Sequence, residues 1–211
     1  VTRLAEAMPN GQHHTMVYVL AYGGLRWGEL VALRRDRINI LGRTLQIAQS
    51  ATELAGRLEF GTPKTHQSRT VHLPAFVSDL VGKHLGDIED HPEAFLFPAP
   101  QRGPLRYANM RKTVWDGARQ RAGDDLVEIT PHDLRHTCAS LMRAAGADVK
   151  AIQQQLGHRN ASVTLNTYTH LFEGDLAEVM DRLDTHSAIK SRPVRVLGDI
   201  IDLPQRSKNP R

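Results

Sequence analysis

The strongest constraint on the fold is a switch in hydrophobic periodicity along the chain. Apolar and polar residues alternate across a short turn within Ile38–Ile47, and alternate again within Leu58–Leu73. On both sides of this region, apolar residues instead recur at spacings of three and four. Because alternation is typical of half-buried strands and the longer spacing of amphipathic helices, the sequence predicts an α+β fold. That fold is mainly α-helical and carries small antiparallel β-sheets or hairpins.

Glycine, proline and capping residues set the expected ends of the helices. Gly23–Gly24 predicts a corner between the first two, and Thr130, Asp148 and Ser162 are expected N-caps of later ones. Pro131 fits the first position of the helix that Thr130 caps. The expected helices cover residues 15–22, 27–33, 75–85, 107–122, 131–145, 149–156 and 163–172.

Length and cysteine content exclude several classes of protein. A chain of 211 residues accommodates one ordinary globular domain and a tail. The single cysteine, Cys138, excludes an internal disulfide framework and favours a reducing compartment. Since no stretch approaches the roughly 18 apolar residues needed to span a bilayer, we expect a cytoplasmic protein without a membrane partner.

Charge distribution points to a polyanion more clearly than net charge does. The formal net charge is only +4, but the segment 101–122 carries six basic residues against Asp116 alone. This segregation indicates a basic face directed at phosphates; the alternative is a solvated helix surface. The basic residues are Arg102, Arg106, Arg111, Lys112, Arg119 and Arg121.

The helix expected from Pro131 carries the densest group of candidate site residues. His132, Arg135 and His136 share one face, which we expect to point away from the core, near a helix N-terminus that favours anions. A solvated face with a capping histidine is the structural alternative. His132 and His136 also have the spacing of zinc ligands, so a zinc-dependent hydrolase is a further alternative, although Asp133 replaces the glutamate of that motif and no third ligand follows. The expected buried face comprises Leu134, Cys138, Leu141, Met142 and Ala145.

Three further residues have chemical potential elsewhere in the chain. Tyr168 lies in a polar context, but a phenol with a pKa of about 10 needs a base and positive potential to act as a nucleophile. Arg26 follows two glycines and precedes Glu29, and Lys64 lies in a polar turn. Taken singly, none of them supports a functional claim, because the structural alternatives are a packed ring for Tyr168, a salt bridge for Arg26 and a surface lysine for Lys64.

Taken in chain order, five segments resemble the catalytic domain of the tyrosine recombinases, the phage integrase family. They are Gly24–Leu30, Pro63–Thr65, His132–Thr137, Leu156–His158 and Thr167–His170. The resemblance covers about residues 13–172 and implies the DNA breaking-and-rejoining catalytic fold. By this resemblance, Arg26 and Arg135 are phosphate-clamping arginines, Lys64 is a general acid, His132 and His158 are active-site histidines and Tyr168 is the nucleophile.

The resemblance also implies an activity and its partners. The expected function is site-specific recombination through a 3′-phosphotyrosyl intermediate, with no metal, ATP or other cofactor. The expected partners are double-stranded DNA attachment sites, further protomers in a synaptic tetramer, and accessory DNA-bending or directionality proteins, in a bacterial or phage-encoded system. The rival interpretation is a noncatalytic DNA-binding module of the same fold.

The expected domain organisation has two parts. Residues 1–189 form the catalytic domain, whose last helix, at 173–189, packs either on its own domain or on a neighbouring protomer. Residues 190–211 form a basic, proline-containing tail. Since the family's N-terminal DNA-clamping domain does not fit before Thr15, we expect a catalytic fragment that lacks a core-binding domain.

Overall fold

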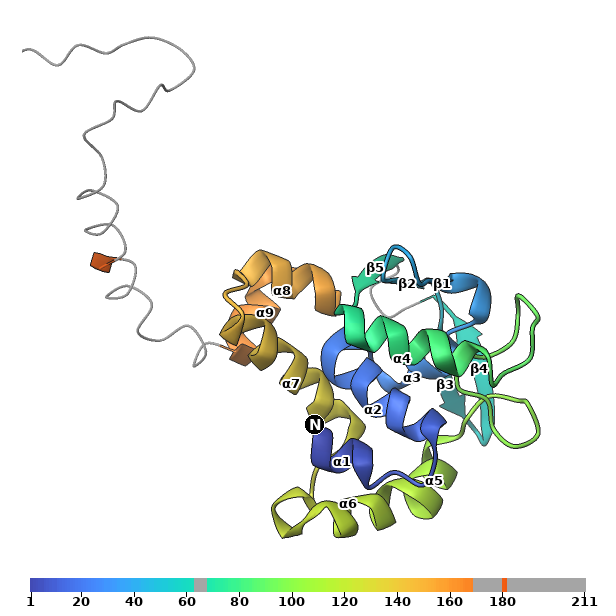
Figure 1. The fold of residues 1–211 in the computed structure, drawn as a ribbon. Helices are drawn as coiled ribbons and strands as arrows, with labels where there is room; N and C mark the ends of the chain where they lie inside the picture. The colour runs from blue at the N-terminus through green and yellow to red at the C-terminus, as the bar shows by residue number, and fades with distance from the viewer. Residues whose placement is uncertain (63–67, 169–179, 182–211) are drawn as a thin grey trace, which may run out of the picture. The chain divides into compact units, whose positions relative to one another are not determined.

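The computed structural model describes residues 1–62, 68–168 and 180–181. The chain divides into two units, Val1–Leu171 and Phe172–Arg211, and the elements below all belong to the first (Figure 1). Lys64 and nearly all of the segments predicted at 173–189 and 190–211 lie outside the described residues.

Helices make up most of the first unit, as predicted. Among the described residues, no helix is both long and apolar enough to cross a membrane. A π-helical turn, Arg111–Trp115, joins α5 to α6, so the helix expected at 107–122 is continuous but locally widened. The helices are α1 (Thr2–Glu6), α2 (Gly11–Gly23), α3 (Trp27–Ala32), α4 (Ala75–Leu85), α5 (Tyr107–Met110), α6 (Asp116–Ala122), α7 (Pro131–Ala144), α8 (Val149–Leu156) and α9 (Ala161–Tyr168).

Two of the three predicted N-caps are confirmed. The Asp133 carboxylate accepts a hydrogen bond from the Thr130 backbone N–H at 2.8 Å, which completes a capping box at α7. Asp148 caps α8 by accepting from the Ala151 N–H at 2.7 Å. The prediction for α9 was wrong: the helix begins at Ala161, and the side chain of Asn160 accepts from the third N–H of the helix in place of Ser162.

The strands form two separate antiparallel sheets. One has the order β1 (Ile38–Asn39), β2 (Thr44–Ile47) and β5 (Arg69–His72), so the first predicted pair is confirmed. The other is a hairpin of β3 (Ser50–Leu54) and β4 (Arg57–Gly61).

The second predicted pair, within Leu58–Leu73, was wrong because the preceding turn selects another partner. Ala55 and Gly56 have φ angles of 46° and 74°, the left-handed conformation of a tight two-residue hairpin turn, and they bring Leu54 opposite Arg57. β5 pairs with β2 instead, where Val71 lies opposite Leu45 and both side chains are buried in the core.

The centre of the core is α2, which packs against α1, α4 and α7 (Figure 1). The expected apolar face of α7 is only partly confirmed: Leu134 and Cys138 are buried, Leu141 and Met142 are half-buried, and Ala145 is exposed. The buried half of α7 is therefore its N-terminal half, which also carries the candidate site residues.

Candidate active site

Arg135 lies inside the protein, contrary to the prediction that its helix face points outward. Only 2% of the residue is exposed, and its guanidinium donates to the Gly24 carbonyl and, at 2.7 Å, to the Leu156 carbonyl. These carbonyls lie at the C-terminal ends of α2 and α8, where unpaired acceptors and the helix dipole favour a cation. Burial, and then the charge of Arg26, lower the pKa of Arg135 to about 10, so it remains cationic at neutral pH.

Arg26 is held at the start of α3 by Glu29. Its backbone N–H and its Nη1 donate to the Glu29 carboxylate at 2.8 and 3.0 Å. Glu29 is only 1% exposed and also accepts two hydrogen bonds from Arg69, at 2.8 and 2.7 Å. Burial favours the neutral acid, but the hydrogen bonds and charge of Arg69, and then those of Arg26, keep the pKa of Glu29 below its usual value. The carboxylate thus orients a cation that remains partly exposed.

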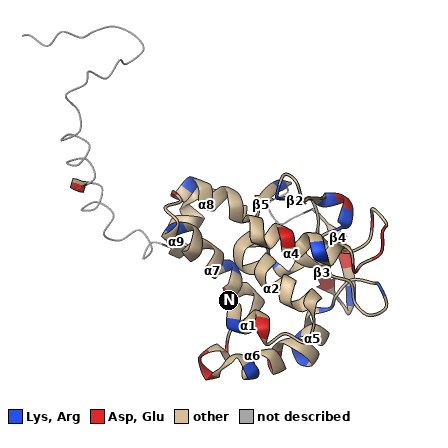
Figure 2. Cartoon of the chain, in the orientation of Figure 1, with Lys and Arg blue, Asp and Glu red and all other residues tan. Residues whose placement is uncertain are grey.

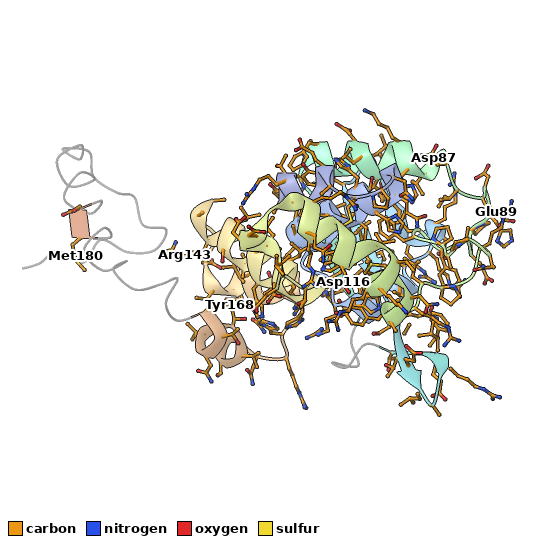
Figure 3. All side chains as sticks on the ribbon, turned by 90° about the horizontal axis from the view of Figure 1, so that it is seen from below. Asp87, Glu89, Asp116, Arg143, Tyr168 and Met180 are labelled. Atoms are coloured by element: carbon orange, nitrogen blue, oxygen red, sulfur yellow. The ribbon has the colours of Figure 1, made fainter. Side chains whose placement is uncertain are left out.

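Tyr168, at the end of α9, lies against α7 (Figure 3). Its phenol oxygen is 2.9 Å from Nδ1 of His136, and only 3% of the residue is exposed. Burial raises the pKa of Tyr168, while the charge of Arg135 acts in the opposite direction. The hydroxyl therefore has both a potential proton acceptor and a nearby cation, the two conditions that a phenol nucleophile needs.

Two further histidines contact this pair, His158 through Tyr168 and His132 through His136. The His158 ring stacks on that of Tyr168 with centroids 6.3 Å apart, and its Nδ1 shares a hydrogen bond of 2.8 Å with Thr164. The His132 ring meets His136 edge-on at 4.8 Å.

Both of these histidines are biased toward the neutral form. Burial, and then the charges of Arg135, Arg26 and Arg69, lower the pKa of His158 to about 4. Burial, His136 and Arg135 lower the pKa of His132 in the same direction. A neutral imidazole carries one ring nitrogen that accepts a hydrogen bond or a proton and one N–H that donates a hydrogen bond.

The structure thus brings five of the six predicted site residues into one region, and Lys64 lies outside the described residues. Electrostatic influence on His132 and His158 comes from both Arg26 and Arg135, so the two arginines act on one site. Sequence reasoning considered His136 only as a helix-face or zinc residue and missed its contact with Tyr168. It missed Arg69 entirely, since an arginine at the start of a strand gives no signal of a buried ionic partner.

A zinc site has no support in the described part of the chain. No group of three histidine, cysteine or acidic residues is placed there to hold a metal ion. The Nδ1 atom of His136 is also hydrogen-bonded to Tyr168.

The basic segment 101–122 is more extensively paired than its composition suggests. Arg102 contacts Glu89, Arg106 contacts Glu53, and Arg119 contacts Asp116. Figure 2 accordingly shows acidic as well as basic positions on and around α5 and α6. Because acidic side chains of the same chain neutralise these arginines, the positive charge of the predicted basic face is smaller than its composition suggests.

Comparisons with known proteins identify relatives of this chain. The sequence model of the phage integrase family matches residues 1–174. The integrase of Mycobacterium phage L5 is 31% identical over 174 residues, which cover 79% of this chain and 46% of that protein. Tyrosine recombinase XerA of Thermococcus kodakarensis is 30% identical over 166 residues, covering 78% of this chain and 54% of the relative. The chain therefore spans about half the length of these relatives.

Solved structures show the same fold. A crystal structure of XerA recombinase has a TM-score of 0.64 at 26% identity and covers 90% of this chain and 63% of that one. The Tn1549 transposon integrase, solved in complex with transposon right end DNA, has a TM-score of 0.70 at 22% identity and covers 87% of this chain and 63% of that one. The expected mainly helical fold with small antiparallel sheets is confirmed.

Proposed function

Because the chain belongs to the phage integrase family, we propose that it supplies the catalytic domain of a site-specific DNA recombinase of the tyrosine type. The observation that carries this proposal is the contact between Tyr168 and His136 beside the buried Arg135 cation. A phenol without these neighbours would be a poor nucleophile at neutral pH.

In the proposed reaction, the Tyr168 oxygen attacks a DNA phosphorus, forms a 3′-phosphotyrosyl bond and displaces the 5′-oxygen. Negative charge grows on the nonbridging oxygens as phosphorus becomes five-coordinate. Arg26 and Arg135 stabilise that charge, since planar guanidinium groups match phosphate oxygens and cost little reorganisation when already fixed. Glu29 fixes the first guanidinium, and the carbonyls of Gly24 and Leu156 fix the second.

Two proton transfers accompany the attack. His136 is the imidazole in contact with the phenol and accepts its proton, with His132 as the next ring outward. His158, largely neutral, hydrogen-bonds the scissile phosphate. Lys64 protonates the departing 5′-oxygen, so that an alcohol leaves instead of an alkoxide.

Rejoining reverses the attack. The 5′-hydroxyl of a partner strand displaces Tyr168 from phosphorus, and the phenol recovers its proton. Because the covalent bond to Tyr168 retains the free energy of the phosphodiester, rejoining requires no ATP. The guanidinium groups of Arg26 and Arg135 supply the positive charge that a metal ion would otherwise provide. The proposed partners are duplex recombination sites, further protomers in a synaptic tetramer and accessory DNA-bending or directionality proteins.

A covalent trapping assay tests this function. The full-length gene product is mixed with a tiled set of nicked duplexes spanning the DNA beside its gene, so that cleavage near a nick releases a short strand and prevents rejoining. We expect a protein–DNA adduct that persists in excess EDTA. Y168F should abolish the adduct, whereas Y22F, which also removes one phenol hydroxyl, should retain it.

The rival function, a noncatalytic DNA-binding module, predicts a different outcome of the same assay. It predicts salt-dependent DNA binding with no adduct on any duplex. An adduct that survives in Y168F would instead refute the assignment of the nucleophile.

A further inference from the structure

We propose that Arg69, the first residue of β5, is a positioning residue that controls where the Arg26 guanidinium points. This inference rests on the proposed recombinase function and extends it to a residue outside the six predicted site positions. The Arg69 side chain is 10% exposed and bonded to α3 and α8, so it acts through Arg26 and not on DNA directly.

The contacts of Glu29 show how this control works. Its two oxygens accept four hydrogen bonds, two from the guanidinium of Arg69 and two from the backbone N–H and Nη1 of Arg26. A carboxylate has about four acceptor positions, so Arg69 takes the half that Arg26 would otherwise occupy. Arg26 is consequently limited to one guanidinium contact with Glu29, and 27% of its side chain stays exposed.

Charge leads to the same conclusion. Glu29 carries one negative charge between two arginines, so the group of three keeps one net positive charge beside Arg135. Without Arg69, the buried carboxylate would have two empty acceptor positions and Arg26 as its nearest donor. A guanidinium favours bidentate pairing with a carboxylate, so Arg26 would turn onto Glu29 and its charge would be lost to the phosphate.

Arg69 also supports the turn that carries His158. Its Nε donates to the Gln155 carbonyl at 3.2 Å, near the end of α8. Gly157 caps this helix with a φ of +68°, and a Cβ added there would lie 2.6 Å from Cδ of Arg69. The Arg69 side chain therefore contacts Gly157, the residue before His158, and also binds the Glu29 carboxylate that holds Arg26.

Single-turnover adduct formation on the nicked duplexes tests the proposal. R69Q should react about 10²-fold more slowly, similar to the loss of one preorganised donor, with DNA affinity unchanged within about twofold. E29Q/R69Q should recover at least about tenfold over R69Q, because no carboxylate then competes for Arg26. R69K, which keeps the charge but loses the fork, should fall between R69Q and the unmodified protein.

The matched control is R3Q, which removes an arginine–carboxylate pair with Asp125 at the surface. Its rate should be unchanged. Thermal unfolding of each variant is measured together with its rate. E29Q/R69Q remains informative if R69Q fails to fold, because the double variant carries no unpaired buried charge.

Two results would overturn the proposal while leaving the recombinase function intact. One is an unmodified rate in R69Q. The other is a rate for E29Q/R69Q that is no faster than the rate of R69Q, as expected if Arg69 is purely structural. Where R69Q is unfolded, the corresponding result is a rate for E29Q/R69Q of no more than about 1% of the unmodified rate. Absence of an adduct with the unmodified protein would refute the proposed function itself, and this inference with it.

Discussion

Replacing Arg135 with lysine separates the contacts it makes within the fold from its proposed role in stabilising the reacting phosphate. The guanidinium donates to two buried carbonyls from two different nitrogens, and an ammonium group cannot reproduce this fork. A hydrogen bond to a charged group contributes about 1.5–3 kcal/mol, so loss of one should lower the free energy of unfolding by about that amount. Cleavage should fall by about 10²–10³-fold, because charge remains but the preorganised donors do not.

Chemical denaturation and single-turnover adduct formation measure the two effects on the same preparation. R119K is the matched control: Arg119 is also largely buried and donates to Asp116 and to the Ile129 carbonyl, but it makes no contact with the candidate site. It should lose stability and retain cleavage once DNA is saturating. The reasoning is refuted if R135K cleaves at the unmodified rate, or if R119K slows cleavage as much as R135K does.

Four further outcomes are expected. G24A should destabilise the fold by about 1–3 kcal/mol more than G56A in thermal unfolding. Both positions have positive φ, but only a Cβ at Gly24 would collide, at 2.5 Å from a Leu156 methyl. Equal losses of stability in the two variants would contradict this. H136F should slow adduct formation by about 10², and an unchanged rate would show that another group accepts the Tyr168 proton. Folding lowers the pKa of His158 from 6.5 to about 4, so between these pH values the unfolded state binds a proton that the folded state does not. The free energy of unfolding should therefore fall as the pH drops from 6.5 to about 4. This fall should be less steep in H158Q. Burial raises the pKa of the Cys138 thiol to about 12, so alkylation should occur only after denaturation, and rapid labelling of the folded protein would show that the core opens there.

Local sequence signals predicted two of the three expected N-caps, and placed the third, at α9, two residues too late. The box formed by Thr130 and Asp133 involves residues three apart, and Asp148 caps its own helix. β-Strand pairing was harder, because the hairpin turn at Ala55–Gly56 has no strong sequence signature and the partner of β5 lies more than twenty residues earlier.

The sequence predicted which residues gather at the candidate site better than it predicted their burial and hydrogen-bond partners. The family segments predicted Arg26, Arg135 and Tyr168 as site residues, but helical periodicity alone placed Arg135 outside the core. Its burial depends on carbonyls at the ends of two other helices, which no pattern within α7 reveals. The Glu29–Arg69 pair joins residues 40 apart and depends on tertiary packing in the same way.

The most direct test of the account is to identify the protein atom that carries the DNA. The trapped adduct is digested with nuclease and protease, and the modified peptide is sequenced by mass spectrometry, which distinguishes the four tyrosines of the chain. We predict a phosphodiester on Tyr168, joined to the 3′ end of the cleaved strand. Modification of Tyr18, Tyr22, Tyr107 or a serine, or attachment through a 5′ end, would contradict the central claim.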